Sequence, residues 1–276
     1  MDYNKPADLV ANMVEAGRVK LGLPVRDLLV RGMLGGAILA TATSLAFTGA
    51  LTTGQPLVGA LIFPVGVILI TLLGLELLTG SFAILPLAHL EHGIPRDRIL
   101  VNWAWVFLGN LIGSVAYGLL LIVSLTKMGV LEPAGIAAMI VKVAEAKTNG
   151  YAALGAAGMA TVFVNGILCN WLVSLGVIMA MSSTSTIGKI AAVWMPIFIF
   201  FAQGFEHTVV NMFLIPTGMI LGAKVTVADW WLWNQIPVTL GNLVGGCLFT
   251  GLALYLAHKP APMAKPAANV PPVPAE

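Results

Sequence analysis

The sequence predicts an all-α integral membrane protein with six transmembrane helices, arranged as two inverted repeats of three. Three observations lead to this fold class: the composition, the positions of charge-free stretches, and two short strings that occur twice. Of the 276 residues, 58% are hydrophobic and only 9% are charged. A soluble domain carries about 25% charged residues, so this chain cannot cover a globule with a wettable surface. At about 20 residues for each span, the chain holds six spans in one unit.

Residues 1–31 precede the first span and mix acidic with basic side chains. They contain no short apolar run of the kind found in signal peptides, so we expect the first span to be retained. An apolar stripe at helical spacing runs through this segment: Val10, Met13, Val14, Gly17 and Leu21. The stripe predicts an amphipathic helix lying against the membrane surface, with a frayed soluble tail as the alternative.

Stretches without charged side chains locate the six spans. Residues 32–75 contain no Asp, Glu, Lys or Arg, and the turn-like residues 52–56 divide them into two spans. We expect the remaining spans at 99–126, 153–181, 190–221 and 233–257. The pore domain then covers 32–258. Residues 259–276 contain six prolines, which predict a disordered tail.

The Lys and Arg side chains are distributed unevenly between the two sides of this arrangement. Ten of the 14 fall on the side that holds both termini, and four fall on the other side. Cytoplasmic loops carry an excess of Lys and Arg. We therefore expect a multi-pass protein of the cell (cytoplasmic) membrane with both termini in the cytoplasm.

Two short strings recur at nearly the same offset. Gly74-Leu75-Glu76 is matched by Gly204-Phe205-Glu206, 130 residues later, and 108–113 is matched by 240–245, 132 residues later. Because each unit has three spans, the second copy enters the membrane from the opposite face, giving inverted repeats over about 32–126 and 153–257. Chance recurrence of apolar strings is the alternative. The second string also contains G-x-x-x-G, which permits close helix packing.

Glu76 and Glu206 lie deep in apolar stretches, where an ionisable side chain costs about 3 kcal/mol. Glycine and proline surround each of them, which makes both stretches poor continuous helices. We expect the second and fifth helices to be broken near the membrane midplane, with half-helix ends that attract anions and are supported by the two carboxylates. Continuous, proline-kinked helices in which the Glu residues help packing are the alternative.

Other classes of function find no support in the residues. The net charge is +2 and no cluster of Lys and Arg occurs, so we expect no nucleic-acid partner. Cys169 and Cys247 lie in apolar runs and read as buried thiols. No G-x-S-x-G or H-E-x-x-H motif occurs. We expect a protein that is not an enzyme and has no cofactor and no metal site.

Residues 204–213, Gly-Phe-Glu-His-Thr-Val-Val-Asn-Met-Phe, resemble the signature of the formate/nitrite transporter family, and of its formate channels most closely. Residues 76–80, 166–171 and 236–242 resemble further motifs of this family, and the resemblance extends from about Lys20 to Ala257. It implies an aquaporin-like protomer with broken second and fifth helices. It also implies a homopentamer with one pore in each protomer.

The resemblance also assigns roles to individual positions. His207 matches the central pore histidine, Thr79 the loop threonine that binds it, and Asn170 a pore asparagine of the fourth span. Phe63 and Phe200 match aromatic residues of the hydrophobic constrictions. Further positions complete the set: Val67 and Leu78 near the constrictions, Lys20 and Lys147 in the inner and outer vestibules, and Asn211 with Glu76 and Glu206 as supports of the breaks. Leu78 stands where formate channels often have Phe.

The expected function is passage of a small monovalent anion through a pore with apolar constrictions. Desolvating an anion is costly unless it meets a positive field or takes up a proton. We expect Lys20 and Lys147 to concentrate the anion, and His207 to donate a hydrogen bond or a proton. Formate ranks first, with nitrite, hydrosulfide, lactate or acetate as alternatives; protons and the lipid bilayer are the other partners. A water or glycerol channel would need paired Asn-Pro-Ala loops, and the chain has no Asn-Pro dipeptide.

Overall fold

The computed structural model describes residues 2–259, which form helices joined by short links and one isolated bridge between Tyr3 and Ser183. The predicted tail at 259–276 lies, except for its first residue, outside the described part. The helices are α1 (Pro6–Leu21), α2 (Val25–Thr53), α3 (Pro56–Ile62), α4 (Val65–Leu72), α5 (Leu78–His92), α6 (Arg96–Thr126), α7 (Ile136–Ala146), α8 (Asn149–Ala152), α9 (Gly155–Ala180), α10 (Thr186–Ala202), α11 (Thr208–Ile220), α12 (Val227–Trp230), π-helical η1 (Trp231–Gln235), α13 (Ile236–Val244), π-helical η2 (Gly245–Leu252) and α14 (Ala253–His258).

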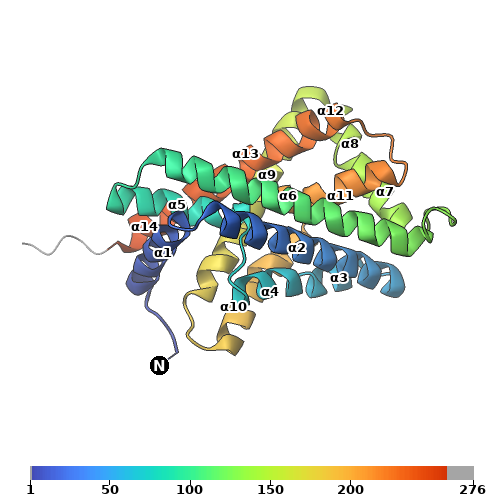
Figure 1. Ribbon diagram of the computed structural model, residues 1–276. Coiled ribbons are helices and arrows are strands. Elements are labelled where there is room, and N and C mark those ends of the chain that lie inside the picture. The colour runs from blue at the N-terminus through green and yellow to red at the C-terminus, as the bar shows by residue number, and fades with distance from the viewer. Residues whose placement is uncertain (1, 260–276) are drawn as a thin grey trace, which may run out of the picture.

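Four helical stretches are long and apolar enough to cross a membrane: Val25–Thr53, Arg96–Thr126, Gly155–Ala180 and Val227–His258. The other apolar helices are shorter, at Pro56–Leu72, Thr186–Ala202 and Thr208–Ile220. The second and fifth predicted spans are thus divided among short helices. The protein is an all-helical membrane protein in which the long helices α2 and α6 run side by side and α1 and α14 lie toward one end (Figure 1).

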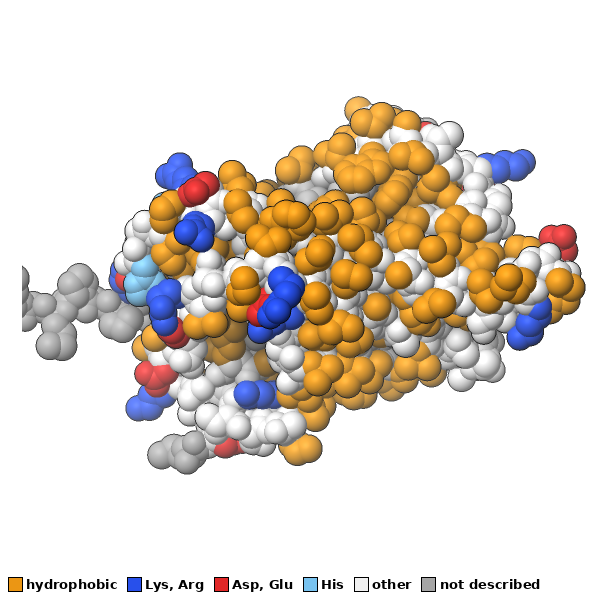
Figure 2. Space-filling model, viewed as in Figure 1, with side chains coloured by type: hydrophobic (Ala, Val, Ile, Leu, Met, Phe, Trp, Pro, Cys, Tyr) orange, Lys and Arg blue, Asp and Glu red, His pale blue; other side chains and the backbone are white. Residues whose placement is uncertain are grey.

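Apolar side chains cover much of the outer surface. Figure 2 shows them over the middle of the visible face, with the charged side chains gathered toward its two ends. Large exposed apolar residues on α2 and α6 include Leu34, Leu45, Leu119 and Leu120. Apolar surface of this extent marks contact with lipid or with another protein.

Two non-helical links interrupt the short apolar helices, at residues 73–77 between α4 and α5 and at 203–207 between α10 and α11. The second residue of each link is a glycine in the left-handed region, Gly74 with φ +62° and Gly204 with φ +70°. The next residue closes the preceding helix with a hydrogen bond to the carbonyl five residues earlier, from Leu75 N to Ile70 O at 3.0 Å and from Phe205 N to Phe200 O at 3.3 Å. Glycine favours this helix ending because it lacks the Cβ that clashes there.

Helix α1 buries its apolar stripe against α5 rather than presenting it to lipid. Val10, Met13 and Val14 belong to a cluster with Ile84 and Leu87 of α5. The close approach depends on a glycine, because a Cβ on Gly17 would lie 2.5 Å from the carbonyl oxygen of Ile84. The N-terminal helix is therefore fixed to the helical body.

Close crossings hold the long helices together in both halves. Between α2 and α6, a Cβ on Gly113 would overlap the carbonyl group of Met33. Between α9 and α13, a Cβ on Gly241 would overlap the carbonyl oxygen of Phe163. These crossings explain the repeated G-x-x-x-G strings, since small residues allow helix backbones to approach.

Replacing Gly113 with alanine should therefore destabilise the protein by about 1–3 kcal/mol, the usual cost of overpacking. Thermal unfolding in detergent measures this change, with the loss of the monodisperse size-exclusion peak on heating as the signal. Gly80→Ala is the matched control, because its Cβ would meet only the two methyl groups of Val177, at 3.5 and 3.9 Å. Equal melting temperatures for the two variants would contradict the role of this crossing.

Candidate functional site

An asparagine of α6 fixes the first link to its neighbouring helices. The Asn110 side chain donates from Nδ2 to the carbonyl oxygens of Gly32, at 2.8 Å, and Glu76, at 2.9 Å. Its Oδ1 accepts from the backbone N–H of Leu78 at 3.0 Å. These bonds satisfy polar backbone groups that a helix would otherwise pair internally, and they place the N-terminus of α5.

Asn242 of α13 makes the same three hydrogen bonds in the second half. Its Nδ2 donates to the carbonyl oxygens of Gly166, at 2.8 Å, and Glu206, at 2.9 Å. Its Oδ1 accepts from the backbone N–H of Thr208 at 2.9 Å. The repeat seen in the sequence therefore corresponds to one local structure built twice, at the N-termini of α5 and α11.

These bonds of Asn110 and Asn242 were not expected from the sequence, although both residues lie in the repeated string. The available signal was a buried amide at the same place in both copies. An amide in an apolar helix needs partners, and the nearest unpaired groups are those of a non-helical link.

Glu76 of the first link pairs with the lysine expected in the inner vestibule. Lys20 Nζ on α1 lies 2.5 Å from Glu76 Oε1, and the Glu76 side chain is almost fully buried. In the described part of the chain, Glu76 Oε2 has no hydrogen-bond partner. The positive charge of Lys20 is thus compensated by a buried carboxylate.

Glu206 of the second link has a fuller set of partners. Its Oε1 lies 2.9 Å from Lys147 Nζ and accepts from the Tyr151 hydroxyl, also at 2.9 Å. Its Oε2 accepts from the side-chain amides of Asn211, at 2.8 Å, and Asn234, at 3.3 Å. Burial and the Glu206 carboxylate raise the pKa of Tyr151, so its hydroxyl remains a donor. Tyr151 and Asn234 were not singled out from the sequence.

One substitution between the halves accounts for one of the partners that Glu76 lacks. Ser81 stands 130 residues before Asn211, the offset that separates the two glutamates. Its hydroxyl donates to Leu78 O at 2.7 Å instead of reaching the carboxylate. The two halves therefore share a backbone design but differ in the polar side chains around the glutamate.

His207 ends the second link and begins α11. Its Nδ1 accepts a hydrogen bond from the backbone N–H of Val210 at 3.2 Å, so the side chain acts as the N-cap of the helix. Its Nε2 lies 3.1 Å from Thr79 Oγ1 of α5. Because Nδ1 is an acceptor, this network assigns the ring proton to Nε2, which donates to Thr79. The side chains of His207 and Thr79 are both buried.

The residues expected at the constrictions pack beside this histidine. Phe63 lies between α3 and α4 with its ring centroid 5.6 Å from that of Phe200 and 3.9 Å from that of Phe201. The Phe200 ring lies 5.7 Å from the His207 ring. The expected aromatic and aliphatic residues share one buried cluster: Phe63, Val67, Leu78 and Phe200. Phe201 was not singled out from the sequence.

Asn170 of α9 joins the two halves at their centre. Its Nδ2 donates to the carbonyl oxygens of Thr79, at 3.0 Å, and Asn242, at 2.7 Å. Its Oδ1 is buried and has no partner among the described residues. Asn170 therefore positions the backbone of Thr79, the residue that contacts His207.

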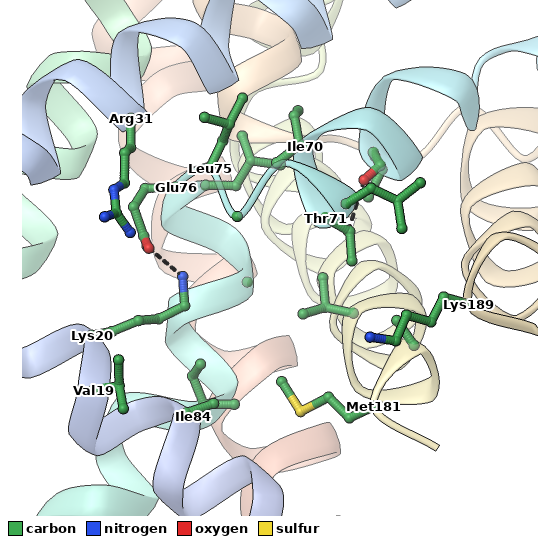
Figure 3. Close-up of a pocket in the computed structure, with 18 of the residues that line it drawn as sticks. Val19, Lys20, Arg31, Ile70, Thr71, Leu75, Glu76, Ile84, Met181 and Lys189 are labelled. Carbon is green, nitrogen blue, oxygen red and sulfur yellow. Dashed lines mark hydrogen bonds and ion pairs between the residues drawn. The ribbon is translucent and has the colours of Figure 1, made fainter. Parts of the chain in front are cut away.

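A cavity of about 580 Å³ lies on the α1 side of these residues. Its walls come from α1, α2, α4, α5, α9 and α10, and its polar lining includes Lys20, Arg31, Glu76 and Lys189 (Figure 3). Val67 of the aromatic and aliphatic cluster also lines it. The cavity thus runs from the charged end of α1 toward the apolar cluster beside His207. Within residues 2–259, no group of three His, Cys, Asp or Glu side chains could hold a metal ion.

The family model for formate/nitrite transporters matches residues 7–256 of this sequence. The chain belongs to the formate/nitrite transporter family. It is 38% identical to the probable formate transporter of Methanothermobacter thermautotrophicus, over 93% of this chain and 97% of that protein. The family is one of transporters and channels, so the resemblance read from residues 204–213 is confirmed.

Two solved structures are similar to this member of the formate/nitrite transporter family. An ion channel of the same family has a TM-score of 0.76 and 31% sequence identity, covering 91% of this chain and 98% of that chain. A pentameric formate channel with formate bound has a TM-score of 0.72 and 25% identity, covering 84% and 97%. The likeness extends over nearly the whole of both structures.

Proposed function

We propose that this chain is a channel for small monovalent anions, with formate as its first substrate, and that His207 and Thr79 form the centre of its pore. The observation that carries the proposal is the 3.1 Å contact between these two side chains, because it joins the N-termini of two helices from opposite halves. The similarity to proteins named formate transporter and formate channel supports formate.

The proposed pore domain has six spans in an aquaporin-like inverted repeat. In this proposal α3, α4 and α5 together form the second span, and α10 and α11 form the fifth, each broken at its glutamate-bearing link. The matching hydrogen bonds of Asn110 and Asn242 support this assignment of helices to spans, since they hold both links in the same way. The N-terminal segment 1–31 and the proline-rich tail 259–276 lie outside this domain.

The proposed assembly is a homopentamer in the cytoplasmic membrane, with both termini in the cytoplasm. The excess of Lys and Arg on the terminal side supports the orientation. The large exposed apolar residues of α2 and α6 provide surface for lipid and for neighbouring protomers. The similarity to a pentameric formate channel supports the number of subunits.

In the proposed mechanism, the anion enters the cavity beside α1 and reaches the buried cluster around Phe63 and Phe200. The N-termini of α5 and α11 provide a positive field at this point, because their first N–H groups are not all paired within the helix. The Nε2–H of His207 provides a donor that the anion can use in place of Thr79. A proton that the anion takes up from solution at this stage converts it to the neutral acid and removes the remaining cost of desolvating the charge.

A flux panel in proteoliposomes tests this function. We expect formate to enter faster than nitrite, hydrosulfide, lactate or acetate, and faster at lower pH, while glycerol uptake stays at the level of empty vesicles. Faster uptake of nitrite or hydrosulfide than of formate would show that formate is not the preferred substrate, but it would be consistent with the proposed pore. Anion flux no higher than in empty vesicles would exclude the proposed function, and uptake of glycerol alone would favour a neutral-solute channel.

A further inference from the structure

The cavity beside α1 contains more positive charge than its glutamates compensate. Lys20 is paired with Glu76 at 2.5 Å, and Glu15, which also lines the cavity, is paired with Arg18 at 2.6 Å. These two pairs add no net charge to the lining. The other charged residues in the lining are Arg31 and Lys189, and both are cations.

Arg31 lies on α2 and is only weakly compensated. Its nearest acidic partner is Asp27, at 3.6 Å, and that carboxylate also lies 3.2 Å from Arg26. Two guanidinium groups thus share one carboxylate. The Arg31 side chain is 39% exposed, so its donors remain accessible to a small solute.

Lys189 faces the same cavity from another side. It lies near the start of α10, whereas Arg31 comes from α2, and Figure 3 shows the two side chains on different walls of the cavity. Among the described residues, Lys189 forms no ion pair. An anion in the cavity therefore meets Lys189, which has no carboxylate partner among the described residues, and Arg31, which shares its carboxylate with Arg26.

The outer half has a neutral residue at the position that corresponds to Arg31. The carbonyl oxygen of Arg31 accepts from Glu76 N at 3.4 Å, and that of Asn165 accepts from Glu206 N at 3.3 Å. The next residue in each case, Gly32 or Gly166, contacts the bracing asparagine of its own half. The structure thus aligns Arg31 with Asn165.

The side chain of Asn165 also has different contacts from that of Arg31. Its Nδ2 donates to the Tyr151 hydroxyl at 3.1 Å, which places its side chain in the buried hydrogen-bond network around Glu206. An amide in this network carries no charge that could hold an anion. The two mouths of the pore are therefore unequal at this position.

We propose that Arg31, with Lys189 on another wall, forms a carboxylate-binding site in the inner cavity that has no counterpart in the outer half. A guanidinium group presents parallel N–H donors that fit the two oxygens of a carboxylate, and a lysine ammonium adds a point charge. This inference rests on the proposed function. Because Glu76 compensates the charge of Lys20, Arg31 and not Lys20 is the residue that first binds the anion from the α1 side.

The site gives the two sides of the membrane different affinities for the anion. Passive flux still follows the gradient, so the direction of net transport does not change. The concentration of formate that half-saturates flux is lower from the α1 side than from the other side. Raising the salt concentration reduces this difference, because exposed charges are screened.

Arg31→Gln tests the site in proteoliposomes whose protein orientation is known from the protease protection of an N-terminal tag. We expect half-saturation from the α1 side to require roughly three- to tenfold more formate, the net size of one ordinary hydrogen bond in water, with no change from the other side. Arg31→Lys should restore part of the loss, since the charge returns without the paired donors.

Arg98→Gln is the matched control, because it removes the same charge from an exposed position that is absent from the cavity lining. Equal changes in Arg98→Gln and Arg31→Gln, or equal changes from both sides, would overturn the inference. Lys189→Gln provides a second test with the same expected asymmetry, which applies also where Arg31→Gln does not fold. Absence of formate flux in the unmodified protein would instead exclude the proposed function.

Discussion

Replacing Asn242 with alanine should lower the free energy of unfolding by about 3–9 kcal/mol, the largest stability change we expect from a single substitution in this chain. The Asn242 side chain is fully buried and pairs with three backbone groups. Each of those groups would remain buried without a partner, at about 1–3 kcal/mol apiece. Asn110→Ala should have a similar effect, because it removes the same three bonds in the first half.

Thermal unfolding and monodispersity in detergent measure this loss. Asn149→Ala is the control, since it makes the same change at a residue that forms one exposed hydrogen bond, to Lys224 O. We expect its melting temperature to stay close to that of the unmodified protein. An Asn242→Ala protein as stable as the Asn149→Ala protein would mean that the link does not need this brace.

Replacing His207 with asparagine should reduce formate uptake by about tenfold or more and remove most of its dependence on pH. Asparagine is a favourable N-cap, so the start of α11 can keep a side-chain acceptor for Val210 N. The substitution removes the only titratable ring in contact with Thr79 in the described part of the chain. It thus separates the titration of His207 from its role in ending the link.

Proteoliposome uptake measured over a range of pH values tests this expectation, with formate concentration held constant. His89→Asn is the control, because it removes an imidazole from the last turn of the same helix that carries Thr79. It should leave both the rate and the pH dependence intact. If His207→Asn keeps the pH profile of the unmodified protein, proton transfer by His207 does not control passage.

The sequence predicted the family and the all-helical membrane class because both depend on patterns along the chain. Charge-free stretches locate apolar helices directly, and residues 204–213 form a contiguous motif. The position of each link also follows from local chemistry, since Gly74 and Gly204 adopt the left-handed conformation that ends a helix. Features that depend on a few neighbouring residues could therefore be predicted from the sequence.

The pairing of side chains between different helices could not be predicted in the same way. Nothing in the sequence around Lys20 indicates that it contacts Glu76, 56 residues away, rather than open solvent. The bond between Asn170 and Thr79 O likewise depends on how α9 packs against α5. Such contacts depend on the relative positions of helices, which periodicity does not specify.

The π-helical turns show the same limit. Hydropathy treats residues 233–257 as one regular span, whereas the structure contains η1 (Trp231–Gln235) and η2 (Gly245–Leu252) at and within this stretch. Asn234 lies within η1 and contacts Glu206 and the carbonyl oxygen of Lys147, so this irregular turn helps to complete the network around the glutamate.

The two asparagine braces have a consequence for how the chain is made. Every partner of Asn110 lies between residues 32 and 78, so the first half can complete its brace as soon as α6 has left the ribosome. Asn242 likewise binds only residues 166–208, all of them synthesised before it. Only contacts such as Asn170 to Thr79 require both halves. Biogenesis can thus proceed as two separate insertions followed by one docking step.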